Sequence, residues 1–207
     1  LMIISITKRC NLNCTGCYSK VLHKEQTTEL SAERYKQIFS EAVSLGVSII
    51  LLAGGEPLIR RDILEVAACF PSIIFPIFTN GISIDSQYAD FFAKNRNLIP
   101  VISLEGREKE TDFRRGEGVF AHFESICTLL QERKLFWGVS HTLTNPAFKL
   151  QLSAKYLKEY IKKGCQLFFF VEYVPIDPNS MELVLTNAQK ESVQSIVDSL
   201  IDRKSVV

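Results

Sequence analysis

Residues 48–70 read SIILLAGGEPLIRRDILEVAACF and contain one complete unit of the fold. The stretch starts with an apolar run, continues through a Gly-Gly-Glu-Pro loop and ends with an amphipathic segment. A short apolar run bounded by glycine predicts a buried strand, and the segment after the proline predicts a helix. The unit is therefore strand, loop and helix.

The same unit occurs six times along the chain. Strands are predicted over Met2–Ile6, Ser48–Leu52, Ile73–Phe78, Leu98–Leu104, Phe136–Thr142 and Leu167–Tyr173, and helices over Ser31–Leu45, Arg61–Phe70, Ser86–Asn95, Val119–Arg133, Lys149–Lys162 and Asn187–Arg203. Strict alternation indicates parallel strands joined by helical crossovers. Because six units are fewer than the eight of a closed barrel, we predict an α/β fold, an open three-quarter (βα)6 TIM-like barrel.

Composition limits the possible partners and location of the protein. The chain has 207 residues, enough for one sizeable domain, and its 24 basic residues nearly balance its 23 acidic ones, so we expect no nucleic-acid partner. No apolar run reaches membrane-spanning length and the N-terminus has no signal-peptide pattern, so we expect a cytoplasmic protein with no membrane partner. The sequence starts without Met, almost on a strand. We therefore expect residues 1–207 to be one core domain excised from a longer chain.

Three cysteines follow the first predicted strand with C-x3-C-x2-C spacing: Cys10, Cys14 and Cys17. Three thiolates on a four-iron cluster leave one iron without a protein ligand, whereas clusters that only transfer electrons usually have four. The alternative is a zinc site with His23 as fourth ligand, although zinc sites usually contain paired C-x2-C ligands. We interpret the remaining cysteines as small buried hydrophobes: Cys69, Cys127 and Cys165.

Polar or glycine-containing segments follow the other predicted strands. Ligands of parallel α/β folds bind at the carboxyl ends of the strands, so these segments predict one concave site. In chain order they are Gly54-Gly55-Glu56-Pro57, Thr79-Asn80-Gly81, Ser103-Leu104-Glu105-Gly106, Ser140 with Thr142, and Glu172 with Tyr173 and Pro175.

On the cysteine motif and Gly54-Gly55-Glu56-Pro57, the chain resembles the radical S-adenosylmethionine (SAM) enzymes, whose partial barrel matches almost the whole chain. Thr79-Asn80-Gly81 and Ser103-Leu104-Glu105-Gly106 further resemble the peptide-modifying and cofactor-maturing, SPASM-like branch. A cysteine-rich C-terminal domain often follows in that branch. No cysteine occurs after Cys165, so an auxiliary-cluster domain is not among these residues.

The resemblance implies two cofactors, a [4Fe–4S] cluster and SAM, and a role for each matching residue. The three motif cysteines would hold the cluster and so act in catalysis. The resemblance implies cofactor-binding positions at Gly54, Gly55, Pro57 and Asn80, a bond from the SAM amino group to Glu56, one from its carboxylate or ribose to Ser103, ribose contacts of Ser140 and Thr142, and aromatic residues Tyr18 and Tyr173 beside the adenine.

The implied activity is oxidoreductase chemistry. The cluster would receive an electron from a donor such as flavodoxin or ferredoxin and cleave SAM reductively. The resulting 5′-deoxyadenosyl radical would take a hydrogen atom from a peptide or cofactor precursor. One alternative is the same chemistry on a small metabolite, nucleotide or lipid. Another is a non-catalytic iron–sulfur sensor or scaffold, which Gly54-Gly55-Glu56-Pro57 disfavours because a sensor has no need to hold methionine.

Two positions depart from the family pattern, and several polar residues have simpler readings. Gly16 replaces a common aromatic residue before the third cysteine, and Glu105 replaces Asp. We expect Arg114 and Arg115 in the loop after the fourth strand, solvated or paired with Glu108, Glu110 or Asp112. The alternative is that they bind a carboxylate of SAM or of a substrate, because Arg suits bidentate recognition. Alternation along the fifth strand turns His141 toward the helices. Glu172 fits a site residue and a structural one equally.

Overall fold

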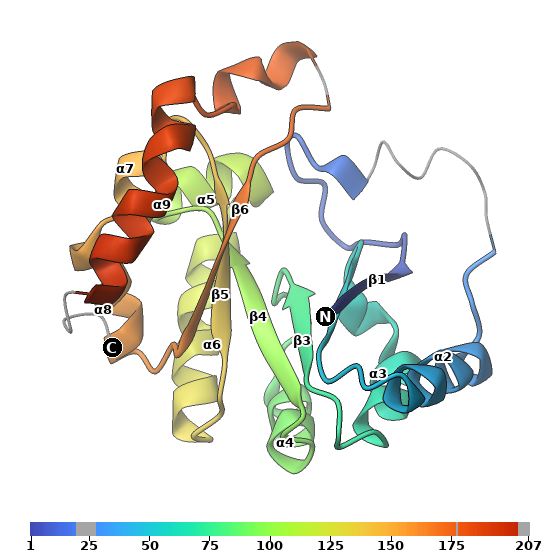
Figure 1. Cartoon of the computed structure of the whole chain (residues 1–207). Coiled ribbons are helices and arrows are strands. Elements are labelled where there is room, and N and C mark those ends of the chain that lie inside the picture. The colour runs from blue at the N-terminus through green and yellow to red at the C-terminus, as the bar shows by residue number, and fades with distance from the viewer. Residues whose placement is uncertain (20–27, 177, 203–207) are drawn as a thin grey trace.

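The computed structural model describes residues 1–19, 28–176 and 178–202. Its centre is one six-stranded sheet in the order β1-β2-β3-β4-β5-β6, and each neighbouring pair is parallel. Helices cover the outer side of this curved sheet (Figure 1). The predicted open partial barrel of parallel strands is confirmed.

The strands lie close to their predicted positions. They are β1 (Met2–Thr7), β2 (Ile50–Gly54), β3 (Phe75–Thr79), β4 (Leu98–Leu104), β5 (Gly138–Leu143) and β6 (Leu167–Glu172). The β2 strand runs two residues further than predicted, to Gly54, because the Gly-Gly segment continues beside the end of β1.

The helices are α2 (Ala32–Ser44), η1 (Pro57–Ile59), α3 (Arg61–Ala68), α4 (Ser86–Lys94), α5 (Glu108–Arg115), α6 (Val119–Glu132), α7 (Phe148–Gln151), α8 (Ala154–Lys162), η2 (Pro178–Leu183) and α9 (Asn187–Asp202). They agree with the prediction except at α5, at the division of one predicted helix into α7 and α8, and at the short helices η1 and η2, which were not predicted. The segment after β4, expected as a loop, forms α5. The helix expected over Lys149–Lys162 is divided at Ser153, whose side chain accepts a hydrogen bond from the Tyr156 N–H and so starts α8.

The main core lies between the sheet and its helices. Ile77 of β3, Leu104 of β4 and Val139 of β5 point to this side and are completely buried. His141 also points there, as predicted. It packs against both Phe168 and Phe170, and its Nδ1 lies 2.9 Å from the Leu104 carbonyl oxygen.

The opposite face of the sheet is concave. Phe78 of β3 and Phe169 of β6 touch with ring centroids 4.9 Å apart, although β4 and β5 lie between their strands. Only a strongly curved sheet brings these side chains together. Ser103 and Ser140 are neighbours in register on the same face, in the layer of Phe169 and one layer nearer the carboxyl ends of the strands than Phe78.

The described residues contain no helix that is long and apolar enough to span a membrane.

Candidate functional site

The cysteine run leaves the end of β1 and lies at the mouth of the barrel. Cys10 is exposed, whereas Cys14 and Cys17 are half-buried, and the six cysteines form no disulfide. The Leu12 N–H donates to Cys10 Sγ at 3.4 Å. The loop therefore presents one open thiol and two that pack against the protein.

Charges connect Cys14 to the opposite side of the site. The pKa of the Cys14 thiol lies above its ordinary value: burial raises it most, the guanidinium groups of Arg115 and Arg114 lower it, and the neighbouring Cys17 and Cys10 raise it. The three thiols and two arginines thus form one electrostatic neighbourhood. Positive charge here stabilises thiolates, the form that binds iron.

The arrangement fits a cluster better than a single metal ion. Within residues 1–19, 28–176 and 178–202, no three His, Cys, Asp or Glu side chains converge on one ion position. The thiolates of an iron–sulfur cluster bind different iron atoms, so they need not converge, whereas the ligands of a zinc ion must. His23, the fourth ligand of the zinc alternative, lies outside the described residues.

Glu56 connects the ends of β2 and β3. Its carboxylate accepts hydrogen bonds from the Leu58 N–H at 3.0 Å, the Thr79 hydroxyl at 2.7 Å and the Asn80 N–H at 2.7 Å. The side chain is fully buried, and this burial raises its pKa although all three donors lower it. In this structure the carboxylate is therefore occupied by the protein itself.

Gly54 and Gly55 are required by the chain next to them. A Cβ on Gly54 would lie 2.3 Å from the Thr7 carbonyl oxygen, and one on Gly55 would lie 2.2 Å from that of Arg9. The Gly55 N–H also donates to the Thr7 carbonyl at 2.8 Å. The room these glycines leave is thus filled by the start of the cysteine loop, which they hold against β2. Pro57, which was also predicted to bind the cofactor, is buried at the start of η1.

Asn80 links β3 to the cysteine loop. Its side-chain Nδ2 donates to Asn11 Oδ1 at 2.7 Å and lies 3.8 Å from Cys10 Sγ. A hydrogen bond to a thiolate adjusts its electron density, so Asn80 is placed to act on the Cys10 sulfur. Sequence reasoning selected Asn80 but missed its partner Asn11, which the adjacent cysteine could have indicated.

A second network supports the start of the same loop, and it was not predicted. Glu29 accepts hydrogen bonds from the Thr7 hydroxyl at 2.5 Å and the Lys8 N–H at 3.0 Å. It also pairs with Arg60 at 3.1 Å. Arg60 in turn donates to the Ile6 carbonyl at 3.3 Å, which fixes the end of β1.

The predicted hydroxyl residues lie on the concave face in two different settings. Ser103 is half-buried and Ser140 is 7% exposed, and they are paired in register across β4 and β5. The Thr142 hydroxyl, closer to the rim, accepts a hydrogen bond from Arg114 at 2.9 Å.

Arg114 and Arg115 bind Glu105 instead of the acids expected. Arg114 Nη1 lies 2.6 Å and Arg115 Nη2 lies 2.5 Å from Glu105 Oε1, and all three side chains are almost completely buried. Burial alone would raise the pKa of Glu105, but Arg115 and Arg114 together hold it below its ordinary value. Asp112, one of the expected partners, accepts from the Gly118 and Phe120 N–H groups at the start of α6.

The two predicted tyrosines differ in position. Tyr18, directly after the cysteine run, is half exposed. Tyr173, just after β6, is buried, and its ring lies against Gly16 of the cysteine loop. Tyr173 is therefore brought to the cysteines by the fold, from the opposite edge of the sheet.

The structure also shows where Glu172 and the cysteines outside the motif lie. Glu172 is exposed and pairs with Lys190 of α9 at 2.5 Å, which is a structural contact. Cys127 and Cys165 are buried, and burial raises the pKa of each to about 12. The prediction was wrong for Cys69, which is exposed at the end of α3.

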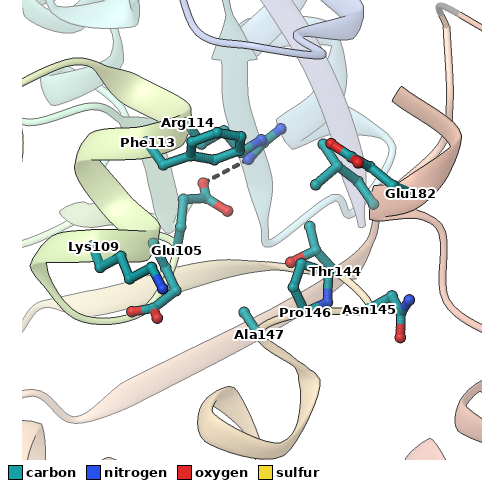
Figure 2. A pocket seen from close by; sticks show the side chains of 11 residues that line it. Glu105, Lys109, Phe113, Arg114, Thr144, Asn145, Pro146, Ala147 and Glu182 are labelled. Carbon is teal, nitrogen blue, oxygen red and sulfur yellow. Dashed lines mark hydrogen bonds and ion pairs between the residues drawn. The ribbon is translucent and has the colours of Figure 1, made fainter. Parts of the chain in front are cut away.

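A pocket of about 440 Å³ opens beside this site. Figure 2 shows Phe113 and Arg114 of α5 above Glu105, facing Thr144 and Pro146 across the pocket. Arg114 and Glu105 thus contact both the neighbourhood of the cysteines and this pocket. A molecule bound in this pocket would lie next to the residues that surround the cysteine loop.

The fold and the site define a partial-barrel protein with a three-cysteine loop at its mouth, and comparison with known proteins gives the family. The pattern of the Radical SAM superfamily matches residues 4–145, and the chain belongs to this superfamily. Its members are enzymes that use a [4Fe–4S] cluster and SAM.

Individual relatives carry out different reactions. The chain is 35% identical over 123 residues to an Fe-coproporphyrin III synthase of Methanosarcina barkeri, covering 58% of this chain and 31% of that protein. It is 34% identical over 117 residues to a PqqA peptide cyclase of Rhizobium meliloti, covering 56% and 31%. The chain thus spans about a third of the length of these relatives.

A solved structure with the same fold is SuiB of Streptococcus suis bound to S-adenosylmethionine. It matches with a TM-score of 0.76 and 18% identity, over 98% of this chain and 45% of SuiB. At this identity the likeness concerns the fold alone.

Proposed function

We propose that this chain is the catalytic core of a radical SAM enzyme that acts on a peptide or a cofactor precursor, with the cluster on Cys10, Cys14 and Cys17. The observation that supports this most is the cysteine loop itself. It is fixed at the carboxyl ends of the strands by Asn80 on one side and by the end of α5 on the other, where the Thr15 N–H donates to the Arg114 carbonyl at 2.8 Å. When bound, the cluster and SAM supply reductive cleavage of SAM and hydrogen-atom abstraction from substrate.

In this proposal the protein side chains bind and orient SAM. Ser103 and Ser140 present hydroxyls on the concave face below the loop, at a depth suited to the carboxylate or ribose of SAM. Thr142 shares its hydroxyl with Arg114, so a ribose contact there would also engage the arginine. Because the Glu56 carboxylate already has three donors, we assign the amino-group contact to the backbone of the Gly54–Glu56 segment.

The adjacent pocket is our candidate for the substrate-binding site. Its wall combines apolar groups from Phe113, Pro146 and Leu183 with charged groups from Lys109 and Glu182. Such a mixed surface suits a peptide segment, in which apolar and charged groups alternate. The peptide cyclase and the porphyrin-modifying synthase among the relatives support the two substrate classes. A flavodoxin or ferredoxin in the cytoplasm would supply the electron.

The test is SAM cleavage by the reconstituted chain. The protein is loaded with iron and sulfide under anaerobic conditions and incubated with dithionite and SAM, and 5′-deoxyadenosine is measured. We expect the product above the level given by Cys14→Ala. A chain with a verified cluster that forms none would overturn the enzymatic proposal for these residues and favour the sensor alternative.

Substrate class is tested in the same assay. Peptides with mixed apolar and charged sequences should accelerate 5′-deoxyadenosine formation, and Phe113→Ala should reduce this acceleration while leaving the basal rate. Acceleration by small metabolites alone would contradict the peptide assignment.

A further inference from the structure

Gly16, between the second and third motif cysteines, leaves space that a side chain from elsewhere occupies. Its φ is +64°, a conformation that favours glycine. A Cβ at this position would lie 2.3 Å from Oη and 3.0 Å from Cζ of Tyr173. The tyrosine ring therefore lies directly against the backbone of the Cys14–Cys17 segment.

This contact joins the two edges of the open sheet. The cysteine loop follows β1 and Tyr173 follows β6, the first and last strands in the sheet order. Figure 1 shows the two segments meeting at the mouth of the barrel, where the strands themselves do not pair. The ring thus bridges the opening at the level of the cysteines.

Tyr173 is itself held in place. Its side chain is 2% exposed, its N–H donates to the Leu143 carbonyl of β5 at 3.1 Å, and the guanidinium of Arg114 lies 5.6 Å from the ring centroid. Its hydroxyl is buried without a hydrogen-bond partner among the described residues. What Tyr173 contributes against the described part of the loop is therefore the packing of its ring edge, not a hydrogen bond.

We propose that Tyr173 is a positioning residue for the cluster loop: its ring supplies from β6 the packing against the Cys14–Cys17 segment that Gly16 cannot supply. The Thr15 N–H bond to the Arg114 carbonyl fixes the loop on one side, and the ring fixes it on the other. Cys10 is held separately, through Asn80 and Asn11. Tyr173 therefore acts on Cys14 and Cys17 and leaves Cys10 unaffected.

The proposal rests on the proposed function only for the identity of the cluster, and it is tested first without one. In the metal-free chain, the alkylation rates of individual cysteines are measured by mass spectrometry for wild type, Tyr173→Ala and Tyr173→Phe. Tyr173→Ala should accelerate alkylation of Cys14 and Cys17 several-fold relative to Cys10 in the same molecule. Tyr173→Phe should stay near wild type because it keeps the ring.

A matched control separates positioning from general loss of stability. Phe123→Ala removes another buried aromatic ring, which packs against Trp137 and Tyr160 in the main core. It should leave the ratio of Cys14 to Cys10 alkylation unchanged. An equal change of this ratio in Phe123→Ala, or an equal effect of Tyr173→Phe and Tyr173→Ala, would overturn the role of the ring.

Gly16→Ala provides the reciprocal test in the reconstituted protein. Tyr173→Ala should bind iron about 10- to 100-fold more weakly than wild type, the usual loss of affinity when a supporting contact of a metal ligand is removed, and so lose more iron on dilution. Gly16→Ala should also lose iron because its methyl group meets the ring, but Gly16→Ala with Tyr173→Ala should be no worse than Tyr173→Ala alone. Strictly additive losses would contradict contact between these residues. A wild type that assembles no cluster would instead refute the proposed function, and the alkylation result would still stand.

Discussion

Two buried carboxylates lie on opposite sides of the cysteine loop, and they differ in their partners. Glu56, on the β2–β3 side, accepts hydrogen bonds from one hydroxyl and two backbone N–H groups, all neutral. Glu105, at the end of β4, pairs with two buried arginines. Burial raises the pKa of Glu56, whereas Arg115 and Arg114 overcome burial and lower that of Glu105.

The difference indicates two kinds of support for one site. The Glu56 side fixes geometry, because its hydrogen bonds tie the backbone after β3 to the backbone after β2. The Glu105 side fixes charge: one carboxylate against two guanidinium groups leaves a net positive charge near Cys14 and Cys17. Thiolates bound to iron would balance that charge. Four substitutions test this division of roles: one removes a thiol of the cysteine loop, two remove the carboxylates and one removes a hydroxyl of the concave face.

Cys14→Ala should have the largest effect, because it removes one of the three thiols proposed to hold the cluster, the one on which Arg115 and Arg114 of the Glu105 side act. We expect complete loss of the visible absorbance of the reconstituted cluster and of its bound iron. Cys127→Ala, a buried cysteine of α6, is the matched control and should retain both. Loss in both variants would show that the cysteines are wrongly divided.

Glu105→Gln should destabilise the metal-free chain more than Glu56→Gln. Glutamine at position 105 leaves two arginines buried without a counter-charge, at a cost of about 3–5 kcal/mol. Glutamine at position 56 keeps an acceptor oxygen and loses part of three hydrogen bonds from neutral donors, at about 1–3 kcal/mol. Urea unfolding of the two variants and wild type measures this order. The reverse order would contradict the comparison.

The two carboxylates should also respond to pH with opposite signs. The lowered pKa of Glu105 gives stability that is present above its unfolded pKa, near 4.5, and is lost as pH falls through the lower folded value. The raised pKa of Glu56 has the opposite effect: stability falls as pH rises from 4.5 through the higher folded value. Wild type is compared with each Gln variant by urea unfolding from about pH 3 to about pH 7. Difference curves of the same sign would show that one assignment is wrong.

Ser140→Ala should have the smallest effect on the protein and still affect the cofactor. Ser140 lies on the concave face beside Ser103, and loss of one hydroxyl contact is worth about 1 kcal/mol. We expect several-fold weaker SAM binding with little change in unfolding free energy. Ser192→Ala, on the surface helix α9, is the control for a serine far from this face. Equal SAM binding by wild type and Ser140→Ala would remove Ser140 from the site.

The sequence predicted the sheet well because its signals are local. The β4 strand is an apolar run preceded by Asn95-Arg96-Asn97, and its bounds agree with the prediction. The α5 helix was missed because its sequence, EKETDFRR, has only one apolar residue and no apolar periodicity. Its stability comes instead from charges in suitable positions, with acidic residues in its first turn and two arginines in its last.

The site was predictable from the sequence only in part. The cysteines and the Gly-Gly-Glu-Pro segment are recognisable as motifs, but the reason for the glycines, close approach of the Thr7–Arg9 backbone, is a contact between distant segments. The same holds for Gly16 and Tyr173, and for the choice of Glu105 as partner of both arginines. Spacing along the chain contains no information about such contacts.

The central claim is that three thiolates leave one iron of the cluster open to SAM, and electron paramagnetic resonance of the reduced cluster tests it most directly. Spectra of the dithionite-reduced, reconstituted chain are recorded with and without SAM, with Cys14→Ala as the cluster-free reference. We predict that SAM changes the line shape and g-values of the reduced cluster, because it coordinates the open iron. An intact reduced cluster whose spectrum is the same with saturating SAM would contradict the account.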